Sequence, residues 1–95
     1  MKKTFELTHP KIKVARMVEA VKHEIKKYLK RERNKPLPED AGYWDFDCRF
    51  GPTEIEASSL HVTEINKQID KAEADGLTSF YVEILARPGK RKSPQ

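Results

Sequence analysis

The sequence predicts an α+β domain, a two-layer ferredoxin-like sandwich with the element order β-α-β-β-α-β. Two segments carry apolar residues three and four positions apart, which indicates helices with one buried side. Four shorter segments alternate apolar and polar residues, which is typical of strands buried on one face. With 95 residues the chain can build one hydrophobic core, so two helices are expected on one face of a four-stranded antiparallel sheet.

The first half of the chain supplies a strand, a long helix and a second strand. Residues 3–7 alternate and then stop before Pro10, which cannot continue a ladder. Residues 12–33 carry a single apolar stripe, and the helix ends because Asn34 tolerates the left-handed conformation and prolines follow it. Residues 43–50 alternate again, and their inward face holds Trp44, Phe46, Cys48 and Phe50.

The second half supplies a hairpin partner, a shorter helix and a last strand. Residues 53–59 alternate after a Gly-Pro turn. Thr63 is the predicted N-cap of a helix that Gly76 ends. Residues 79–86 are rich in β-branched and aromatic side chains, which favours a central strand. The predicted core residues from the sheet are Phe5, Leu7, Trp44, Phe46, Phe50, Ile55, Phe80, Val82 and Ile84.

One domain accounts for nearly the whole chain. We assign residues 1–88 to it and residues 89–95 to a disordered basic tail, because that last segment has nothing to bury. No apolar run reaches the roughly 20 residues that span a bilayer, and the first residues do not form a signal segment. Cys48 is the one cysteine, which fits a reducing compartment. We therefore expect a cytoplasmic protein that does not bind a membrane.

The net charge of +4 conceals a strong segregation. Residues 11–35 carry ten Lys or Arg and three Glu, whereas residues 37–84 carry eleven Asp or Glu and three Lys or Arg. Basic residues therefore gather on the outward side of the long helix, at Lys22, Lys26, Lys27, Lys30, Arg31 and Arg33. Solvation alone would account for such a ridge, and the functional hypothesis is contact with nucleic-acid phosphates.

The outward face of the predicted sheet is rich in carboxylates. Its members are Glu6, Asp45, Asp47, Arg49, Glu54, Glu56, Tyr81, Glu83 and Leu85. In the expected hairpin register Arg49 pairs with Glu54, and Asp47 lies opposite Glu56. We expect this face to be open to solvent. It is either an ordinary solvated surface or a docking surface for a basic partner, formed by Asp45, Asp47, Glu54, Glu56 and Glu83.

The sequence offers no arrangement of residues that is typical of catalysis. His9, His23 and His61 are scattered, and no two of them stand at the spacing of metal ligands. The carboxylates match no calcium loop, and the four glycines lie in turns rather than in a phosphate-binding loop. Cys48 alternates onto the inward face, where a thiol fills space in the core. We therefore predict no catalytic residue, metal, cofactor or small-molecule substrate, and we favour a binding protein over an enzyme.

Three segments resemble a family of short uncharacterised bacterial proteins. They are residues 1–11 (MKKTFELTHPK), 21–33 (VKHEIKKYLKRER) and 44–51 (WDFDCRFG). The resemblance covers nearly the whole chain and implies a bacterial protein that stands alone. Because that family is named as a domain of unknown function, the resemblance implies no activity.

Two functional hypotheses remain open. In the first, a non-enzymatic protein contacts nucleic-acid phosphates through the basic side of the helix at residues 12–33. In the alternative, the chain is a protein-interaction module or a homodimer. The basic helix of one copy then meets the acidic sheet face of another, or exposed strand edges pair. Partner identity and stoichiometry separate the two hypotheses, because charged contacts weaken with salt in both.

Overall fold

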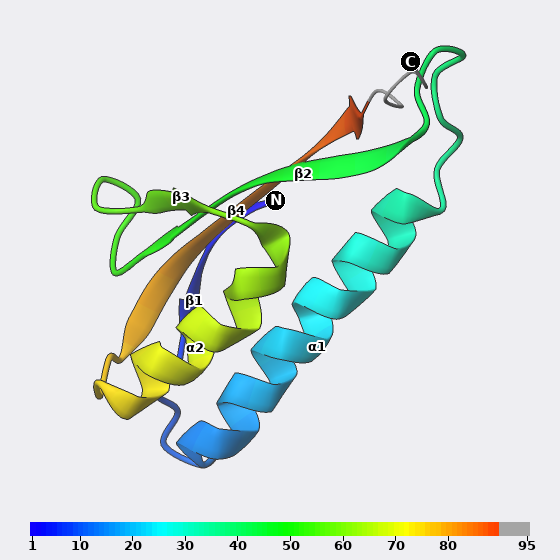
Figure 1. Ribbon diagram of the computed structural model, residues 1–95. Coiled ribbons are helices and arrows are strands. Elements are labelled where there is room, and N and C mark those ends of the chain that lie inside the picture. The colour runs from blue at the N-terminus through cyan, green and yellow to red at the C-terminus, as the bar shows by residue number, and fades with distance from the viewer. Residues whose placement is uncertain (90–95) are drawn as a thin grey trace.

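The computed structural model describes residues 1–89 of the chain (Figure 1). These residues form two α-helices and a four-stranded antiparallel sheet, with a single 3₁₀ turn before the second helix. The predicted α+β class and the element order β-α-β-β-α-β are confirmed. The elements are β1 (Lys2–Glu6), α1 (Val14–Arg33), β2 (Tyr43–Gly51), β3 (Ser58–Leu60), η1 (Val62–Glu64), α2 (Ile65–Ala74) and β4 (Ser79–Gly89).

The strands stand in the order β1-β4-β2-β3, so β4 and β2 occupy the centre of the sheet. Every neighbouring pair is antiparallel. It follows that β1 runs parallel to β2 with β4 between them, and that β3 runs parallel to β4 with β2 between them. Each helix thus joins two parallel strands that a third strand separates, which is the split βαβ arrangement. The finer expectation of a ferredoxin-like strand order is not confirmed.

Both helices cover the same face of the sheet and share one hydrophobic core with it (Figure 1). Phe80 lies at the centre of this core with no solvent exposure, and its ring centroid is 5.0 Å from that of Phe50 and 5.9 Å from that of Phe5. Burying one such side chain stabilises the fold by roughly 1.5–3 kcal/mol. The helices contribute Val18, Val21, Ile25, Ile65, Ile69 and Ala72 to the core. Of the predicted core residues, Trp44 is only half-buried and Ile55 is fully outside.

The turn before β3 departs most from the prediction. Residues 53–59 were expected to form a strand, but β3 starts at Ser58, and Ile55 is 94% exposed at the turn. The chain folds back so closely over Gly51 that a Cβ there would lie 2.6 Å from the Cα of Ala57. The guanidinium of Arg49 holds this turn by donating to the carbonyl oxygens of Glu54 (3.2 Å) and Ala57 (3.0 Å). Alternation alone could not show this, because the turn is fixed by a side chain from the neighbouring strand.

The residues that cap the helices differ in part from the predicted ones. Asn34 caps α1 in a right-handed conformation with φ −84°, so the expected left-handed end is wrong. The predicted N-cap Thr63 is also wrong, because its backbone N–H is a donor to Nδ1 of His61, which starts η1 (3.2 Å). Gly76 ends α2 as predicted. Its φ of +74° allows its N–H to reach Glu73 and that of Leu77 to reach Ala72 (3.1 and 3.0 Å), in the Schellman pattern.

A two-stranded ribbon of β2 and β4 projects beyond the rest of the sheet (Figure 1). Strand β2 pairs with β4 along its whole length, from Tyr43 opposite Gly89 to Gly51 opposite Tyr81. In contrast, β1 pairs with β4 only as far as Glu83, and β3 pairs with only three residues of β2. The molecule measures 54 × 24 × 19 Å as a result.

The predicted tail, residues 89–95, lies outside the described residues except for its first member, Gly89, which is the last residue of β4. Within residues 1–89, neither helix combines the length and the apolar character that crossing a bilayer requires.

Candidate functional site

Part of the sheet face that was expected to be open is buried. Tyr81 and Glu83 point away from the helices, yet they are only 3% and 9% exposed because the turn held by Arg49 lies over them. The Tyr81 hydroxyl donates to Oε1 of Glu83 (2.9 Å), and the Arg49 guanidinium lies 3.5 Å from the same oxygen. Burial, together with this hydrogen bond, raises the pKa of Tyr81 to about 12. The expected pairing of Arg49 with the Glu54 side chain is wrong, since Arg49 stands opposite Ser59.

In the remaining part of this face, Arg87 pairs with two of the carboxylates. Its guanidinium makes salt bridges to Asp45 (2.7 Å) and Asp47 (2.9 Å), which stand on β2. The hydrogen bond to Asp47 and the charges of both aspartates raise the pKa of Arg87 above its ordinary value. Three of the five carboxylates predicted for docking are thus paired within the chain, while Glu54 and Glu56 lie exposed on the turn between β2 and β3. The expected opposition of Asp47 and Glu56 is wrong, because β3 reaches back only to Cys48.

Within residues 1–89, the three histidines and the thiol come from separate segments: His9 and His61 lie outside the helices and strands, His23 lies on α1 and Cys48 lies on β2. Among residues 1–89 no group of three or more His, Cys, Asp or Glu side chains stands close enough to hold a metal ion. His61 and Ser59 line one hollow beside β2, but Nδ1 of His61 is occupied at the start of η1, where it contacts Thr63 (2.8 Å). Cys48 is buried in the core as predicted. Burial, followed by the charges of Asp47 and Asp45, raises the pKa of its thiol to about 11.

We expect the Cys48 thiol to resist modification in the folded protein. Because the thiol is buried, a reagent cannot reach it, and because its pKa is raised, little of it is present as the reactive thiolate. With Ellman's reagent at about pH 8, reaction of the native protein should be at least about a hundredfold slower than in about 6 M guanidinium chloride, because it must wait for opening of the core. Equal rates in the two conditions would place the thiol at the surface.

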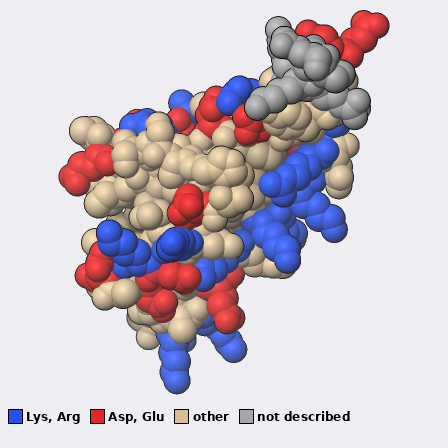
Figure 2. All heavy atoms as spheres, viewed as in Figure 1, with Lys and Arg blue, Asp and Glu red and all other residues tan. Residues whose placement is uncertain are grey.

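The basic side chains of α1 are concentrated in its C-terminal half, and Figure 2 shows Lys and Arg atoms gathered there. Lys22 is the exception among the six predicted residues, because it is half-buried and paired with Asp70 of α2. The guanidinium of Arg31 lies over the ring of Tyr28 (5.7 Å), and that of Arg33 over the ring of Phe46 (5.3 Å). These contacts hold the two arginines in place while leaving them exposed.

The carboxylates that could neutralise this region are engaged elsewhere. Glu24 pairs with Lys3 of β1 (2.9 Å), and Glu32 pairs with Lys35 beyond the helix (2.5 Å). Consequently, considering residues 1–89 alone, five exposed Lys and Arg side chains in the C-terminal half of α1 form no salt bridge: Lys26, Lys27, Lys30, Arg31 and Arg33. The sequence analysis did not separate Lys22 from the other five residues, because its pairing with Asp70 depends on how the two helices pack.

A groove of about 410 Å³ runs between the C-terminal half of α1 and the start of the second helical segment. One wall is basic and the other carries neutral polar groups, while the floor is aliphatic. Sequence reasoning missed it, because a groove depends on how two helices pack; the available signal was the recurrence of basic residues on the flank that faces α2. The residues that line it are Lys22, His23, Lys26 and Arg33 on the basic wall, Thr63 and Asn66 opposite, and Ile25, Leu29, Val62 and Ile65 along the floor.

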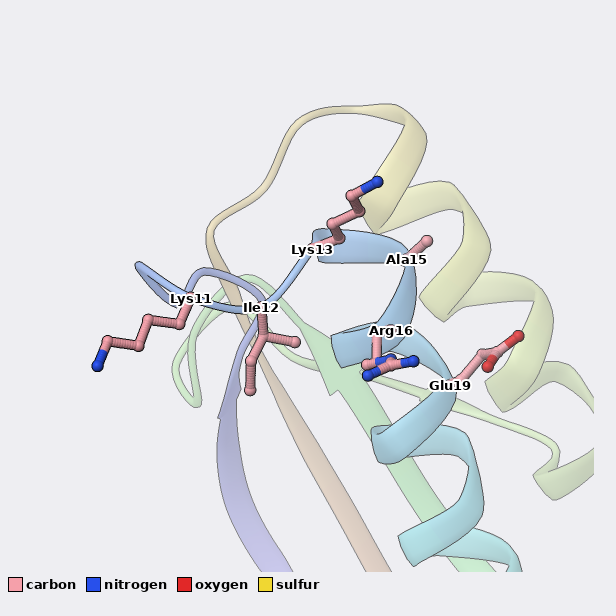
Figure 3. A pocket seen from close by; sticks show the side chains of 6 residues that line it. All are labelled: Lys11, Ile12, Lys13, Ala15, Arg16 and Glu19. Carbon is pink, nitrogen blue, oxygen red and sulfur yellow. The ribbon is translucent and has the colours of Figure 1, made fainter.

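A second hollow lies at the start of α1, and Figure 3 shows the side chains around it. Lys11 and Lys13 point away from each other rather than into a common centre, and Glu19 adds a negative charge on the same side. Basic residues that diverge in this way do not make a pocket for an anion. The groove beside α1 is therefore the better candidate site.

Comparisons with known proteins give a family but no activity. The Family of unknown function (DUF6172) has a model that matches residues 1–94. No curated protein and no solved structure matches the chain. The predicted membership of a family of unknown function is thereby confirmed, and the bacterial origin that the resemblance implied stays a prediction.

Proposed function

The chain belongs to a family whose function is unknown, and we propose that it binds nucleic acid by contacting phosphates with the C-terminal half of α1. The observation that supports this proposal is that five exposed Lys and Arg side chains stand together in that half of α1 and form no salt bridge within residues 1–89. Unpaired cations on one rigid helix can neutralise several neighbouring phosphates at once. Each contact releases a condensed counterion, which favours binding and makes it depend on salt.

The alternative, in which an acidic sheet face docks a basic partner, has less support. Asp45 and Asp47 are already bound by Arg87, and Glu83 is buried beside Arg49. A basic partner would have to replace these internal contacts rather than meet free carboxylates. We further propose a cytoplasmic location, because Cys48 is the one cysteine in the chain and a reducing compartment would suit it.

The test is charge reversal on α1 with a matched control. The variant carries Lys26→Glu, Lys30→Glu and Arg33→Glu, and the control carries Lys11→Glu, Lys13→Glu and Arg16→Glu at the other end of the helix. Both change the net charge equally. We expect the first variant to lose binding to labelled oligonucleotides in fluorescence anisotropy, and the control to keep most of it. The slope of log affinity against log salt should fall by about one for each lost phosphate contact.

Two outcomes would contradict the proposal. Undetectable binding by the unmodified protein at about 50 mM salt is one, because counterion release is strongest there. Equal losses in the two triple variants are the other, since they would mean that net charge rather than this part of α1 decides binding. Circular dichroism of each variant shows whether it is folded before its affinity is compared.

A further inference from the structure

We infer that the ligand is a single strand of nucleic acid that lies in the groove between α1 and α2, rather than a duplex laid along the helix. This inference rests on the proposed function. It specifies that the nucleic acid is single-stranded and that it contacts one side of α1. Three features of the groove carry it: the position of its charges, its aliphatic floor, and the support of one arginine by an aromatic ring.

The basic side chains of α1 lie on two different flanks. Lys26 and Arg33 line the groove, on the flank whose neighbour Lys22 reaches Asp70 of α2. Lys27 and Arg31 do not line it. A strand in the groove would therefore place its phosphates against the first pair alone, whereas a duplex on the crest of the helix would use both pairs.

The floor of the groove is suited to bases rather than to phosphates. Leu29 and Val62 are half-buried there, above the buried side chains of Ile25 and Ile65. An unpaired base can cover such apolar surface with one face of its ring. A duplex keeps the faces of its bases stacked inside and offers only their edges in the grooves, so it would leave the floor uncovered.

Arg33 adds a platform at one end of the groove. Its guanidinium lies over the ring of Phe46 at 5.3 Å while the side chain stays exposed. Guanidinium planes stack on unpaired bases and also bind phosphates. On the opposite wall, Asn66 provides an exposed amide that can pair with a base edge, while the Thr63 hydroxyl is already in contact with Nδ1 of His61 (2.8 Å).

The experiment compares a labelled single strand of about 12 nucleotides with the duplex it forms with its complement. We expect the single strand to bind at least about tenfold more tightly than the duplex at about 50 mM salt. Two double variants remove the same charge from the two flanks, Lys26→Ala with Arg33→Ala and Lys27→Ala with Arg31→Ala. The first should weaken single-strand binding about tenfold, and the second about twofold or less.

A variant that gains affinity is also needed, because a loss of affinity could result from misfolding of the variant. Asn66→Trp adds an aromatic ring to the polar wall at an exposed position, so we expect single-strand affinity to rise about fivefold or more and duplex affinity to stay unchanged. Equal affinity for the two probes, or equal losses of affinity in the two double variants, would contradict binding in the groove. Either result would leave the proposed phosphate contact by α1 intact. If neither probe binds, the proposed function itself fails.

Discussion

Replacing Phe80 with alanine is expected to lower the free energy of unfolding by about 3–5 kcal/mol. The ring is fully buried on the central strand β4 and packs between the rings of Phe5 and Phe50, so its removal leaves a cavity that the surrounding strands cannot close. Equilibrium unfolding in urea measures the change. Trp44 serves as the probe, since its indole is half-buried and bound to the carbonyl oxygen of Lys35 (2.9 Å).

Ile55→Ala is the matched control for this experiment. Alternation in the sequence places Ile55 in the core beside Phe80, whereas the structure leaves it 94% exposed on a turn. We expect its replacement to change the free energy of unfolding by less than about 0.5 kcal/mol. A loss comparable to that of Phe80→Ala would show that residues 53–59 do form a strand facing the helices, and the described turn would then be wrong.

Arg49→Met is expected to cost about 2 kcal/mol of stability and to loosen the turn between β2 and β3. The substitution removes both bonds to carbonyl oxygens of the turn and leaves the buried carboxylate of Glu83 without its cation. Breaking a fully buried pair costs more, about 3–5 kcal/mol. The lower figure applies because 37% of the Arg49 side chain remains exposed, and water screens the lost charge in part.

A double-mutant cycle separates the two roles of Arg49. In the Glu83→Gln background the buried charge is gone, while the side-chain oxygen of Gln can still accept from the Tyr81 hydroxyl. Arg49→Met should therefore cost less there than in the unmodified protein. Hydrogen exchange of amides in residues 53–57 should quicken in both backgrounds, because the bonds to the turn are lost in both. Identical costs in the two backgrounds would mean that the charge pair contributes nothing.

The sequence predicted best where a periodic pattern runs over a long segment. Residues Val18, Val21 and Ile25 recur on one side of α1 and are buried as expected. Alternation over the eight residues 43–50 likewise identified β2. Over such lengths a periodic pattern of apolar residues does not arise by chance from one or two positions. The period of the backbone then decides which side chains are buried.

Contacts between distant segments explain what the sequence could not predict. The pairing of Arg87 with Asp45 was not predicted, because nothing local shows that β4 continues far enough to bring the two residues together. Ile55 obeys the alternating pattern, yet Arg49 and the close approach at Gly51 turn its segment out of the sheet. For the candidate site, the basic residues were identified but the groove was not, since its far wall is supplied by another helix.

The projecting ribbon of β2 and β4 has a hydrodynamic consequence. The radius of gyration is 15.3 Å, against about 13 Å for a compact domain of 100 residues. A body this elongated meets more friction in water than a sphere of equal mass, so a monomer should leave a size-exclusion column early. Calibration with globular standards would then overestimate the mass of one chain. The homodimer hypothesis therefore has to be judged by a mass measurement, such as light scattering or sedimentation equilibrium, and not by elution volume.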